Sequence, residues 1–326
     1  MRNDCKIYDI KKDLKLSWLD GKLIQVPNGN NFNFGYVIFV PNNIKNNTTL
    51  IIEGSNTGKG SSNTLKEGNE IMEKEGLYPL LPIYSIANEL GLPVLYPLFP
   101  RIYNGEEGIY THMLSSNSLN SNTKQIKELG LERVDLQLIE MFKDAKERLK
   151  EDNITIDDKF IIDGFSASAK FANRFTLLHP ELVKLCIAGG VSGVLTLPVK
   201  RYYGENLLYP IGLGDFNTDV EEFKKVRQFY YMGEEDNQND PFIFNEEGKA
   251  KYKGIITTEE LIQMYKIFGK DPINDRWPKT QEIYNDLGIN SKFKTYPGYK
   301  HDPRCATEDI KEEIKTILEI DKELTI

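Results

Sequence analysis

Hydrophobic and polar residues follow two different periods along this chain of 326 residues. Before residue 48, aromatic and β-branched residues at 14–26 and 32–40 predict antiparallel strands, with Pro27-Asn28-Gly29-Asn30 as the turn between them. From residue 50 onward, short apolar runs typical of buried strands alternate with segments of helical period. The strands predicted in this second part comprise residues 50–52, 93–99, 160–163, 184–188, 227–232 and 292–296.

The helical segments lie between these strands. One helix is predicted to bury the stripe Val134, Leu138, Met141, Phe142, Ala145 and Leu149. The other predicted helices cover residues 79–90, the segment up to 178, 258–268, 281–287 and the chain from about 307. Alternation of strand and helix predicts an α/β fold: a mostly parallel, twisted sheet with helices on both faces. Ligands of such sheets bind at the carboxyl ends of the strands.

Two segments, residues 191–225 and 241–290, interrupt this alternation within a domain that we expect to span residues 1–326. Both connect elements at the carboxyl edge of the sheet, so we predict that they are insertions forming a cap above it. They are rich in aromatic residues, which would line an apolar pocket or form the core of the cap. These residues are Tyr202, Tyr203, Tyr209, Phe216, Tyr252, Tyr265, Phe268, Trp277 and Tyr284.

Composition excludes several classes of protein. The chain is 40% hydrophobic and 28% charged, which is typical of a globular protein, and its net charge of -8 argues against nucleic acid or an anionic membrane as the main partner. No apolar run approaches the ~18 residues of a membrane span, and the start lacks the apolar core of a signal peptide, so we expect a cytoplasmic protein. Three cysteines, Cys5, Cys186 and Cys305, indicate neither a disulfide framework nor a zinc site. The sequence leaves open whether the chain forms homo-oligomers.

The turn Gly164-Phe165-Ser166-Ala167-Ser168 joins a predicted buried strand to a predicted helix. A serine at such a strand-to-helix turn is typical of a nucleophile elbow, which raises the hydroxyl above the end of the sheet. The N-terminus of the following helix offers N–H groups to a developing oxyanion. A polar turn without chemistry is the alternative, because the short pattern recurs by chance in many proteins.

A serine nucleophile needs a base, and the chain has three histidines. His179 ends the helix after the elbow, so we expect it to point away from the serine. His112 lies in a polar segment, residues 110–123, that we interpret as a long surface loop, with contact to substrate as the alternative. His301 follows the last predicted strand and therefore reaches the same edge of the sheet as Ser166. We predict His301 as the base.

The base in turn needs a carboxylate that fixes its tautomer. Asp236 follows the strand at 227–232 and lies between Ser166 and His301 in the sequence, which gives the order serine, acid, histidine. Glu234 and Glu235 are close alternatives, and Asp240 is the strongest one. We predict Asp236 as the acid.

The glycine-rich loop after residue 52, which contains Gly54, Gly58, Lys59 and Gly60, has the wrong spacing for a phosphate-binding loop. Three residues rather than four separate Gly54 from Gly58, and a glycine rather than a serine or threonine follows the lysine. In sheets of this kind, the loop after the third strand supplies the second N–H group of an oxyanion hole, and we predict this role for it.

Four motifs resemble those of the α/β-hydrolase superfamily, and within it the esterases of the polyhydroxybutyrate-depolymerase-like or acyl-peptidase-like branch. They are Gly164-Phe165-Ser166-Ala167-Ser168, Gly233-x-x-Asp236, Pro297-Gly298-x-x-His301 and Glu53-Gly54-Ser55. The resemblance covers roughly residues 30–320, and the two insertions match least. It departs from the family at Ser168, which replaces the last glycine of the elbow, and at Glu53, which replaces a histidine that is common in the oxyanion loop.

The resemblance implies a serine hydrolase that cleaves a carboxylic ester or another small acyl substrate through an acyl-enzyme, without cofactor or metal. It implies Ser166, Asp236 and His301 as the catalytic triad, and the backbone N–H groups of Ala167 and Ser55 as the oxyanion hole. Two other functions stay open. One is a serine peptidase for short peptides, in which Glu205, Glu234 or Glu235 would capture a peptide terminus. The other is a non-catalytic binding protein on a hydrolase scaffold.

Overall fold

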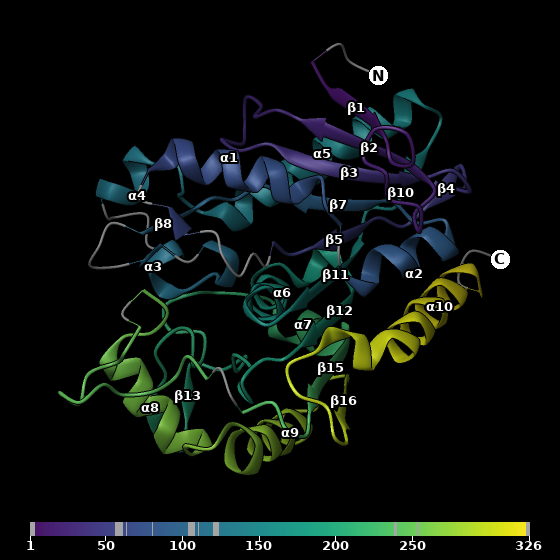
Figure 1. The fold of residues 1–326 in the computed structure, drawn as a ribbon. Coiled ribbons are helices and arrows are strands. Elements are labelled where there is room, and N and C mark those ends of the chain that lie inside the picture. Colours follow the sequence, from purple (N-terminus) through teal and green to yellow (C-terminus); the bar gives the residue numbers. More distant parts are fainter. Residues whose placement is uncertain are drawn as a thin grey trace.

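The structure, a computed structural model, describes residues 4–55, 61–62, 64–79, 81–103, 108–109, 111–119, 124–237, 240–252 and 254–323. Nine strands form one sheet in the order β1-β2-β3-β7-β5-β11-β12-β15-β16. The first three strands and β7 pair antiparallel, and every later neighbour from β7 to β16 pairs parallel. Figure 1 shows the N-terminal strands at one edge of the molecule and β16 on the opposite side.

The strands of this sheet are β1 (Lys6–Asp9), β2 (Gly21–Val26), β3 (Tyr36–Pro41), β5 (Ile51–Glu53), β7 (Val94–Pro97), β11 (Phe160–Phe165), β12 (Val183–Gly189), β15 (Arg227–Gly233) and β16 (Ser291–Tyr296). Short strands outside it are β4 (Asn47–Thr48), β6 (Ser61–Ser62), β8 (Arg101–Tyr103), β9 (Gly108–Ile109), β10 (Thr155–Ile156), β13 (Arg201–Tyr202) and β14 (Glu205–Asn206). The α-helices are α1 (Leu65–Gly76), α2 (Pro82–Leu90), α3 (Ser116–Leu119), α4 (Lys124–Glu128), α5 (Val134–Glu151), α6 (Ala167–Leu178), α7 (Val220–Lys225), α8 (Thr258–Phe268), α9 (Trp277–Asp286) and α10 (Thr307–Glu323).

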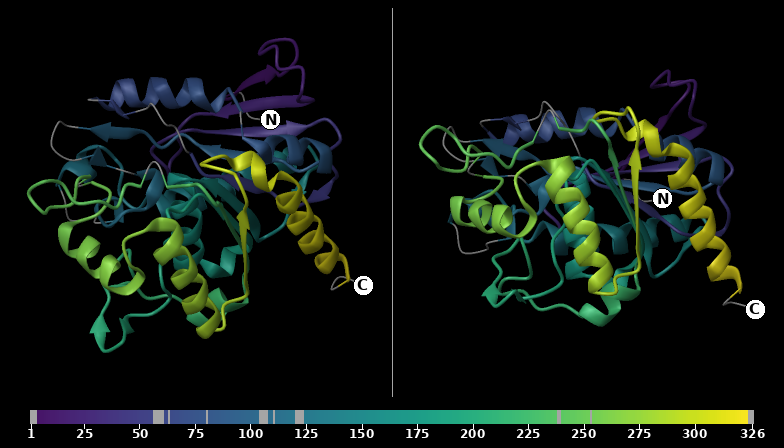
Figure 2. Two further views of the ribbon diagram at one scale, coloured as in Figure 1. Left: turned by 60° about the horizontal axis from the view of Figure 1, so that its bottom comes forward. Right: turned by 90° about the horizontal axis from the view of Figure 1, so that it is seen from below.

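Helices cover both faces of the sheet. Buried residues of α1, α2 and α10 form one apolar cluster with one face, while those of α5, α6, α8 and α9 form a second, larger cluster with the other. Helices α2 and α10 lie side by side on the first face (Figure 1). The left view of Figure 2 shows α8 and α9, in light green, at the end of the molecule away from the N-terminal strands. The fold therefore has three layers, with the sheet between two helical layers.

The α/β prediction of a mostly parallel sheet between helices is confirmed. The buried stripe predicted for α5 is confirmed, since all six of its residues are buried. Helix α8 has the predicted bounds because Thr257 and Glu260 form a capping box that fixes its start. Helix α2 starts three residues later than predicted, at Pro82, which is favoured in the first turn of a helix.

Other parts of the prediction were wrong. Residues 14–20 form a turn and irregular segments rather than a strand, and the strand begins at Gly21, where it pairs with Pro41. Residues 111–119 are not a surface loop, because a 3-10 turn (Thr111–Met113) and α3 bury Met113, Leu114 and Leu119 in the core and bury His112 with them. The remainder of the predicted loop, residues 110 and 120–123, lies outside the described residues. No helix in the described part of the chain has the length and apolar character that crossing a membrane requires.

Candidate active site

Ser166 stands at the turn between β11 and α6 in a strained backbone conformation. Its φ is 62° and its ψ is -115°, a region that costs a residue with a side chain on the order of 1–3 kcal/mol. The turn persists because its neighbours fix it: the Ser166 amide donates to the Gly189 carbonyl of β12 at 2.8 Å. Gly164 allows α6 to approach the strand, since a Cβ there would lie 2.3 Å from the Ser168 carbonyl oxygen. Strained backbone conformations of this kind cluster at functional sites.

Ser168, the departure from the usual glycine of the elbow, is fully buried and hydrogen-bonded within the turn. Its hydroxyl accepts from the Phe165 amide and donates to the Phe165 carbonyl, each at 2.9 Å. Both polar functions of the side chain are therefore satisfied. The structure explains why serine is compatible with this position, where its hydroxyl closes the turn.

Asp236 and His301 come together because the chain after β16 passes closely over the end of β15. A Cβ at Gly233 would lie 2.3 Å from the carbonyl oxygens of Tyr299 and Lys300, so only glycine permits this crossing. His301 Nδ1 then lies 2.9 Å from each carboxylate oxygen of Asp236. Since a carboxylate only accepts, Nδ1 carries the proton and donates, which leaves Nε2 as an acceptor. This is the tautomer that a general base requires.

The His301 ring packs against the Phe165 ring, with centroids 4.5 Å apart. Gly190 makes room for both rings, because a Cβ there would lie 2.8 Å from His301 Cε1 and 2.9 Å from the Phe165 ring. A cavity of about 170 Å³ opens beside them. Its walls include Ser166, Ala167, Lys170, Asp236, Asp240 and His301. The predicted nucleophile, acid and base therefore share one cavity.

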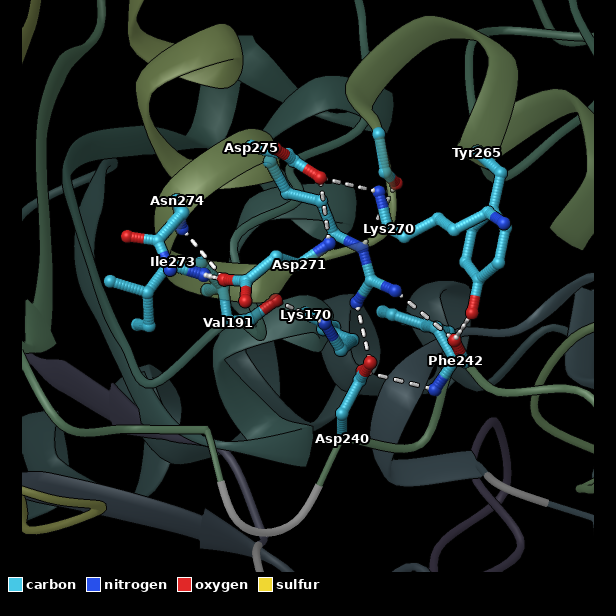
Figure 3. Close-up of polar contacts among 12 residues, drawn as sticks. Lys170, Val191, Asp240, Phe242, Tyr265, Lys270, Asp271, Ile273, Asn274 and Asp275 are labelled. Carbon is cyan, nitrogen blue, oxygen red and sulfur yellow. Dashed lines mark hydrogen bonds and ion pairs between the residues drawn. The ribbon is translucent and has the colours of Figure 1, made fainter.

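Asp240, the alternative acid, has other partners. Its Oδ2 accepts from Arg276 Nη1 at 2.8 Å, and its Oδ1 accepts from the Phe242 amide at 3.1 Å. Figure 3 shows Asp240 and Phe242 with these contacts. In a third contact, Arg276 Nη2 donates to the Phe242 carbonyl at 3.1 Å. Arg276 is completely buried, so Asp240 neutralises a buried guanidinium and anchors the segment that contains Asp240 and Phe242.

The other two histidines lie in different surroundings. His179 closes the far end of α6, and its Nε2 lies 2.9 Å from Asp135 Oδ2, so it does not reach Ser166. His112 lines the same cavity as Ser166. Burial, assisted by the positive charge of Arg101, lowers the pKa of His112 well below its usual range, so this ring is neutral. The sequence prediction missed its burial, for which the apolar Met113 and Leu114 were the available signal.

The loop predicted to supply the second oxyanion donor starts at the end of β5, and its residues 56–60 lie outside the described residues. The Gly54 amide donates to the Asp163 carbonyl at 2.9 Å and is therefore occupied. Ser55 is buried, and its hydroxyl has no partner within the described ranges. Ala167, the first residue of α6, lines the cavity.

Glu53 and Asp163 form a buried carboxyl pair beneath this loop, directly opposite each other on the parallel strands β5 and β11. Neither oxygen of Glu53 accepts a hydrogen bond from another described side chain or amide. Burial, and then the charge of Asp163, raise the pKa of Glu53 well above its usual range, and burial raises the pKa of Asp163 to about 6. The pair therefore holds at least one proton near neutral pH.

Lys170 is a further polar residue of the cavity, and sequence reasoning did not select it. It lies four residues after Ser166 and so on the same face of α6, and this spacing was the available signal. The nine aromatic residues of the two insertions, in contrast, are absent from the cavity wall, and Tyr209, Phe268, Trp277 and Tyr284 are buried in the core. In the described ranges, no group of three or more His, Cys, Asp or Glu side chains could hold a metal ion.

No model of a known protein family matches this sequence, and no curated protein matches it either. Solved structures do match. A poly(3-hydroxybutyrate) depolymerase from Bordetella parapertussis is similar with a TM-score of 0.54 and 13% identity, over 93% of this chain and 91% of that one. Poly(aspartic acid) hydrolase-1 from Sphingomonas sp. KT-1 is similar with a TM-score of 0.50 and 14% identity, over 94% of this chain and 96% of that one. These similarities show that the chain has the α/β-hydrolase fold.

Proposed function

We propose that this chain with the α/β-hydrolase fold is a serine hydrolase that cleaves carboxylic esters through an acyl-enzyme. Ser166 is the nucleophile, His301 the base and Asp236 the acid. The observation that carries the proposal is the hydrogen-bonded pair of His301 and Asp236, which shares a cavity with a serine in a strained turn. The names of both similar structures describe enzymes that hydrolyse or depolymerise, which agrees with this class of reaction.

In the proposed reaction, Nε2 of His301 takes the proton of the Ser166 hydroxyl as Oγ attacks the ester carbonyl carbon. The carbonyl oxygen becomes an oxyanion, and Asp236 stabilises the imidazolium that has formed. Collapse of the tetrahedral intermediate breaks the bond to the alcohol oxygen, which receives the proton from His301. Water then attacks the acyl-enzyme by the same sequence and releases the acid.

The oxyanion is stabilised by two backbone N–H groups, those of Ala167 and Ser55. Ala167 supports this role because it begins α6, where amides lack helical acceptors and carry the positive end of the helix dipole. Ser55 supports it because it directly follows Gly54, whose own amide is already bonded to Asp163. Each such donor contributes about 3 kcal/mol of transition-state stabilisation.

The segments 191–225 and 241–290 act as a cap in this proposal. Ser192 of the first segment and Pro241, Ile255 and Pro272 of the second form part of the cavity wall together with Ser166. A cavity of about 170 Å³ is small compared with the ~300–1,000 Å³ of typical drug-sized ligand sites. The proposed substrate is therefore a small ester.

The peptidase alternative has less support. Glu205 pairs with Lys266, Glu234 is exposed and accepts from the Gly298 amide, and Glu235 is exposed. None of the three lines the Ser166 cavity, so none is placed to capture the terminus of a bound peptide. If Ser166 is unreactive, the alternative of a non-catalytic binding protein on a hydrolase scaffold would be favoured.

The test compares hydrolysis of p-nitrophenyl acetate and butyrate, and labelling by a fluorophosphonate, in the wild type, Ser166→Ala and Ser192→Ala. Ser192 is a matched control because it lines the same cavity and also has a positive φ, of 52°. We expect Ser166→Ala to lose labelling and at least about a thousandfold in kcat, and Ser192→Ala to keep labelling. Folded wild-type protein that neither takes the label nor hydrolyses esters would refute the proposal, as would a label found on Ser192.

A further inference from the structure

Three cationic side chains are buried around the proposed active site although the chain has a net charge of -8. Lys170, Arg174 and Arg276 are 4%, 5% and 0% exposed. Arg276 has a carboxylate partner, Asp240, at 2.8 Å. Arg174 instead donates to the Met113 carbonyl at 2.7 Å and to the Thr196 hydroxyl at 3.4 Å. Burying a cation without a carboxylate partner is costly.

Lys170 is the cation that lines the cavity itself. Its Nζ donates to the Val191 carbonyl at 2.5 Å and lies 4.4 Å from the centre of the Phe242 ring. Figure 3 shows Lys170 next to Val191, with Asp240 and Phe242 in the same cluster. An ammonium group has three N–H donors, and one carbonyl with one aromatic face does not satisfy all of them. An acceptor from a ligand would complete this environment.

The two carboxylates in the cavity wall already have partners of their own. Both oxygens of Asp236 face His301 Nδ1, and both oxygens of Asp240 are bonded, one to Arg276 and one to the Phe242 amide. Burial, and then the neighbouring charge of Arg174, lower the pKa of Lys170 well below its usual range. A carboxylate placed beside Nζ would reverse this effect, because an adjacent opposite charge favours the charged form of the amine.

We propose that Lys170 is a specificity-determining residue that binds a carboxylate of the substrate, so that the enzyme prefers esters carrying a free carboxylate group. The inference rests on the proposed ester hydrolysis and names its substrate class. Ser166 and Lys170 are separated by four residues, or about 6 Å along the helix axis. The carboxylate and the scissile carbonyl are therefore joined by a short chain, as in a hemi-ester of a small dicarboxylic acid.

The test measures kcat/KM for charged and neutral esters of matched size by following acid release in a pH-stat. Monomethyl glutarate against dimethyl glutarate places the carboxylate on the acyl side, and butyryl glycolate against its methyl ester places it on the alcohol side. We expect the wild type to prefer the charged member of at least one pair by about tenfold to a hundredfold, as for a hydrogen bond to a charged group. In Lys170→Met the ratio of kcat/KM for the charged ester to kcat/KM for the neutral ester should approach one. Wild-type enzyme that hydrolyses both members of each pair equally would overturn the inference and leave ester hydrolysis intact.

A structural role for Lys170 predicts a different result, since loss of packing would slow all substrates together and leave the ratio unchanged. Lys143→Met is the matched control: Lys143 is 63% exposed on α5, paired with Glu140, and should keep both the rates and the ratio. A ratio that persists in folded Lys170→Met would assign Lys170 to structure alone and overturn the inference.

A second measurement depends on neither the Lys170 variant nor turnover. Free glutarate should raise the Tm of the Ser166→Ala protein, whereas glutaramide, which has the same length and no charge, should not. Equal effects of the two compounds would overturn the inference. Absence of ester hydrolysis by the wild type together with a selective effect of glutarate would instead refute the proposed function and retain a carboxylate site.

Discussion

Helix α6 has a histidine–aspartate pair near each of its ends, and the two pairs are closely similar. His301 and Asp236 lie near Ser166 at the N-terminal end, and His179 and Asp135 at the C-terminal end, with the same distance of 2.9 Å in both. Each ring also packs against a phenylalanine of the elbow or the helix, at 4.5 Å for His301 and 4.9 Å for His179. The helix of 12 residues separates them by about 18 Å.

The difference between the pairs lies in their third partners. Asp135 is completely buried and also binds Arg133 at 2.6 Å, so its charge is already neutralised. The His301 ring is 28% exposed and lines a cavity together with a serine hydroxyl. A histidine–aspartate contact is therefore not in itself a sign of catalysis. A nucleophile and a space for substrate beside the histidine turn the same contact into a candidate triad.

The largest difference should appear in activity when each aspartate is replaced by asparagine. Asp236→Asn should lower kcat for p-nitrophenyl butyrate by about 10³–10⁴-fold, because the amide no longer fixes the tautomer of His301 or stabilises its imidazolium. Asp135→Asn should stay within about threefold of the wild type, since no contact joins Asp135 to the cavity. Steady-state kinetics on both folded variants checks this, and comparable losses in the two would remove the distinction between the pairs.

Stability should show the opposite order. Asp135→Asn leaves Arg133 and His179 beside an uncharged amide in a buried site, which should lower the free energy of unfolding by about 3 kcal/mol. Asp236→Asn should cost about 1 kcal/mol, because His301 faces a cavity where water can replace the lost interaction. Urea unfolding at pH 7 measures both values. A larger loss of stability for Asp236→Asn would mean that the His301–Asp236 pair contributes more to stability than the His179–Asp135 pair.

The smallest effect concerns Glu53 and Asp163, the carboxyl pair beneath the elbow, which has no counterpart at the far end of α6. The pKa of both groups is raised in the folded protein, so the folded state binds more protons than the unfolded state between about pH 4, the unfolded value, and the folded values. The stability from this pair is present below pH 4 and is lost as pH rises through the folded values, about 6 for Asp163.

Above pH 7, the free energy of unfolding of Glu53→Gln should therefore exceed that of the wild type by on the order of 1 kcal/mol, and this advantage should shrink at pH 5. Thermal unfolding of both proteins at pH 5 and pH 8 gives the comparison, with Glu89→Gln as an exposed control. An advantage that is the same at both pH values would show that the two carboxyl groups do not titrate between these pH values.

Sequence patterns sufficed for the elements with strong local signals. The apolar run of β11 and the turn at Gly164 predicted the elbow, and the position of His301 after β16 predicted which histidine would reach it. The helical pattern of residues 258–268 predicted α8 to the residue. In each case the signal lies within a few residues of the feature, where local chemistry decides the structure.

Features set by tertiary contacts were not predictable in this way. Helix α1 was not predicted, because Gly68 and a charge-rich sequence weaken its helical pattern. His112 is buried because its segment packs against α6. The order of residues in the sequence predicted Asp236, but it gave no sign that the alternative, Asp240, pairs with Arg276, 36 residues further along the chain. Lys170 became a candidate only once its cavity and carbonyl partner were known.

The measurement that tests the central claim most directly is the rate of fluorophosphonate labelling of His301→Gln and His179→Gln beside the wild type. The account predicts that labelling of Ser166 slows by about a thousandfold in His301→Gln, because the serine loses its general base, and is unchanged in His179→Gln. Labelling of folded His301→Gln at the wild-type rate would contradict the account. So would a loss of labelling in folded His179→Gln, because the two pairs would then not differ in the way that their surroundings indicate.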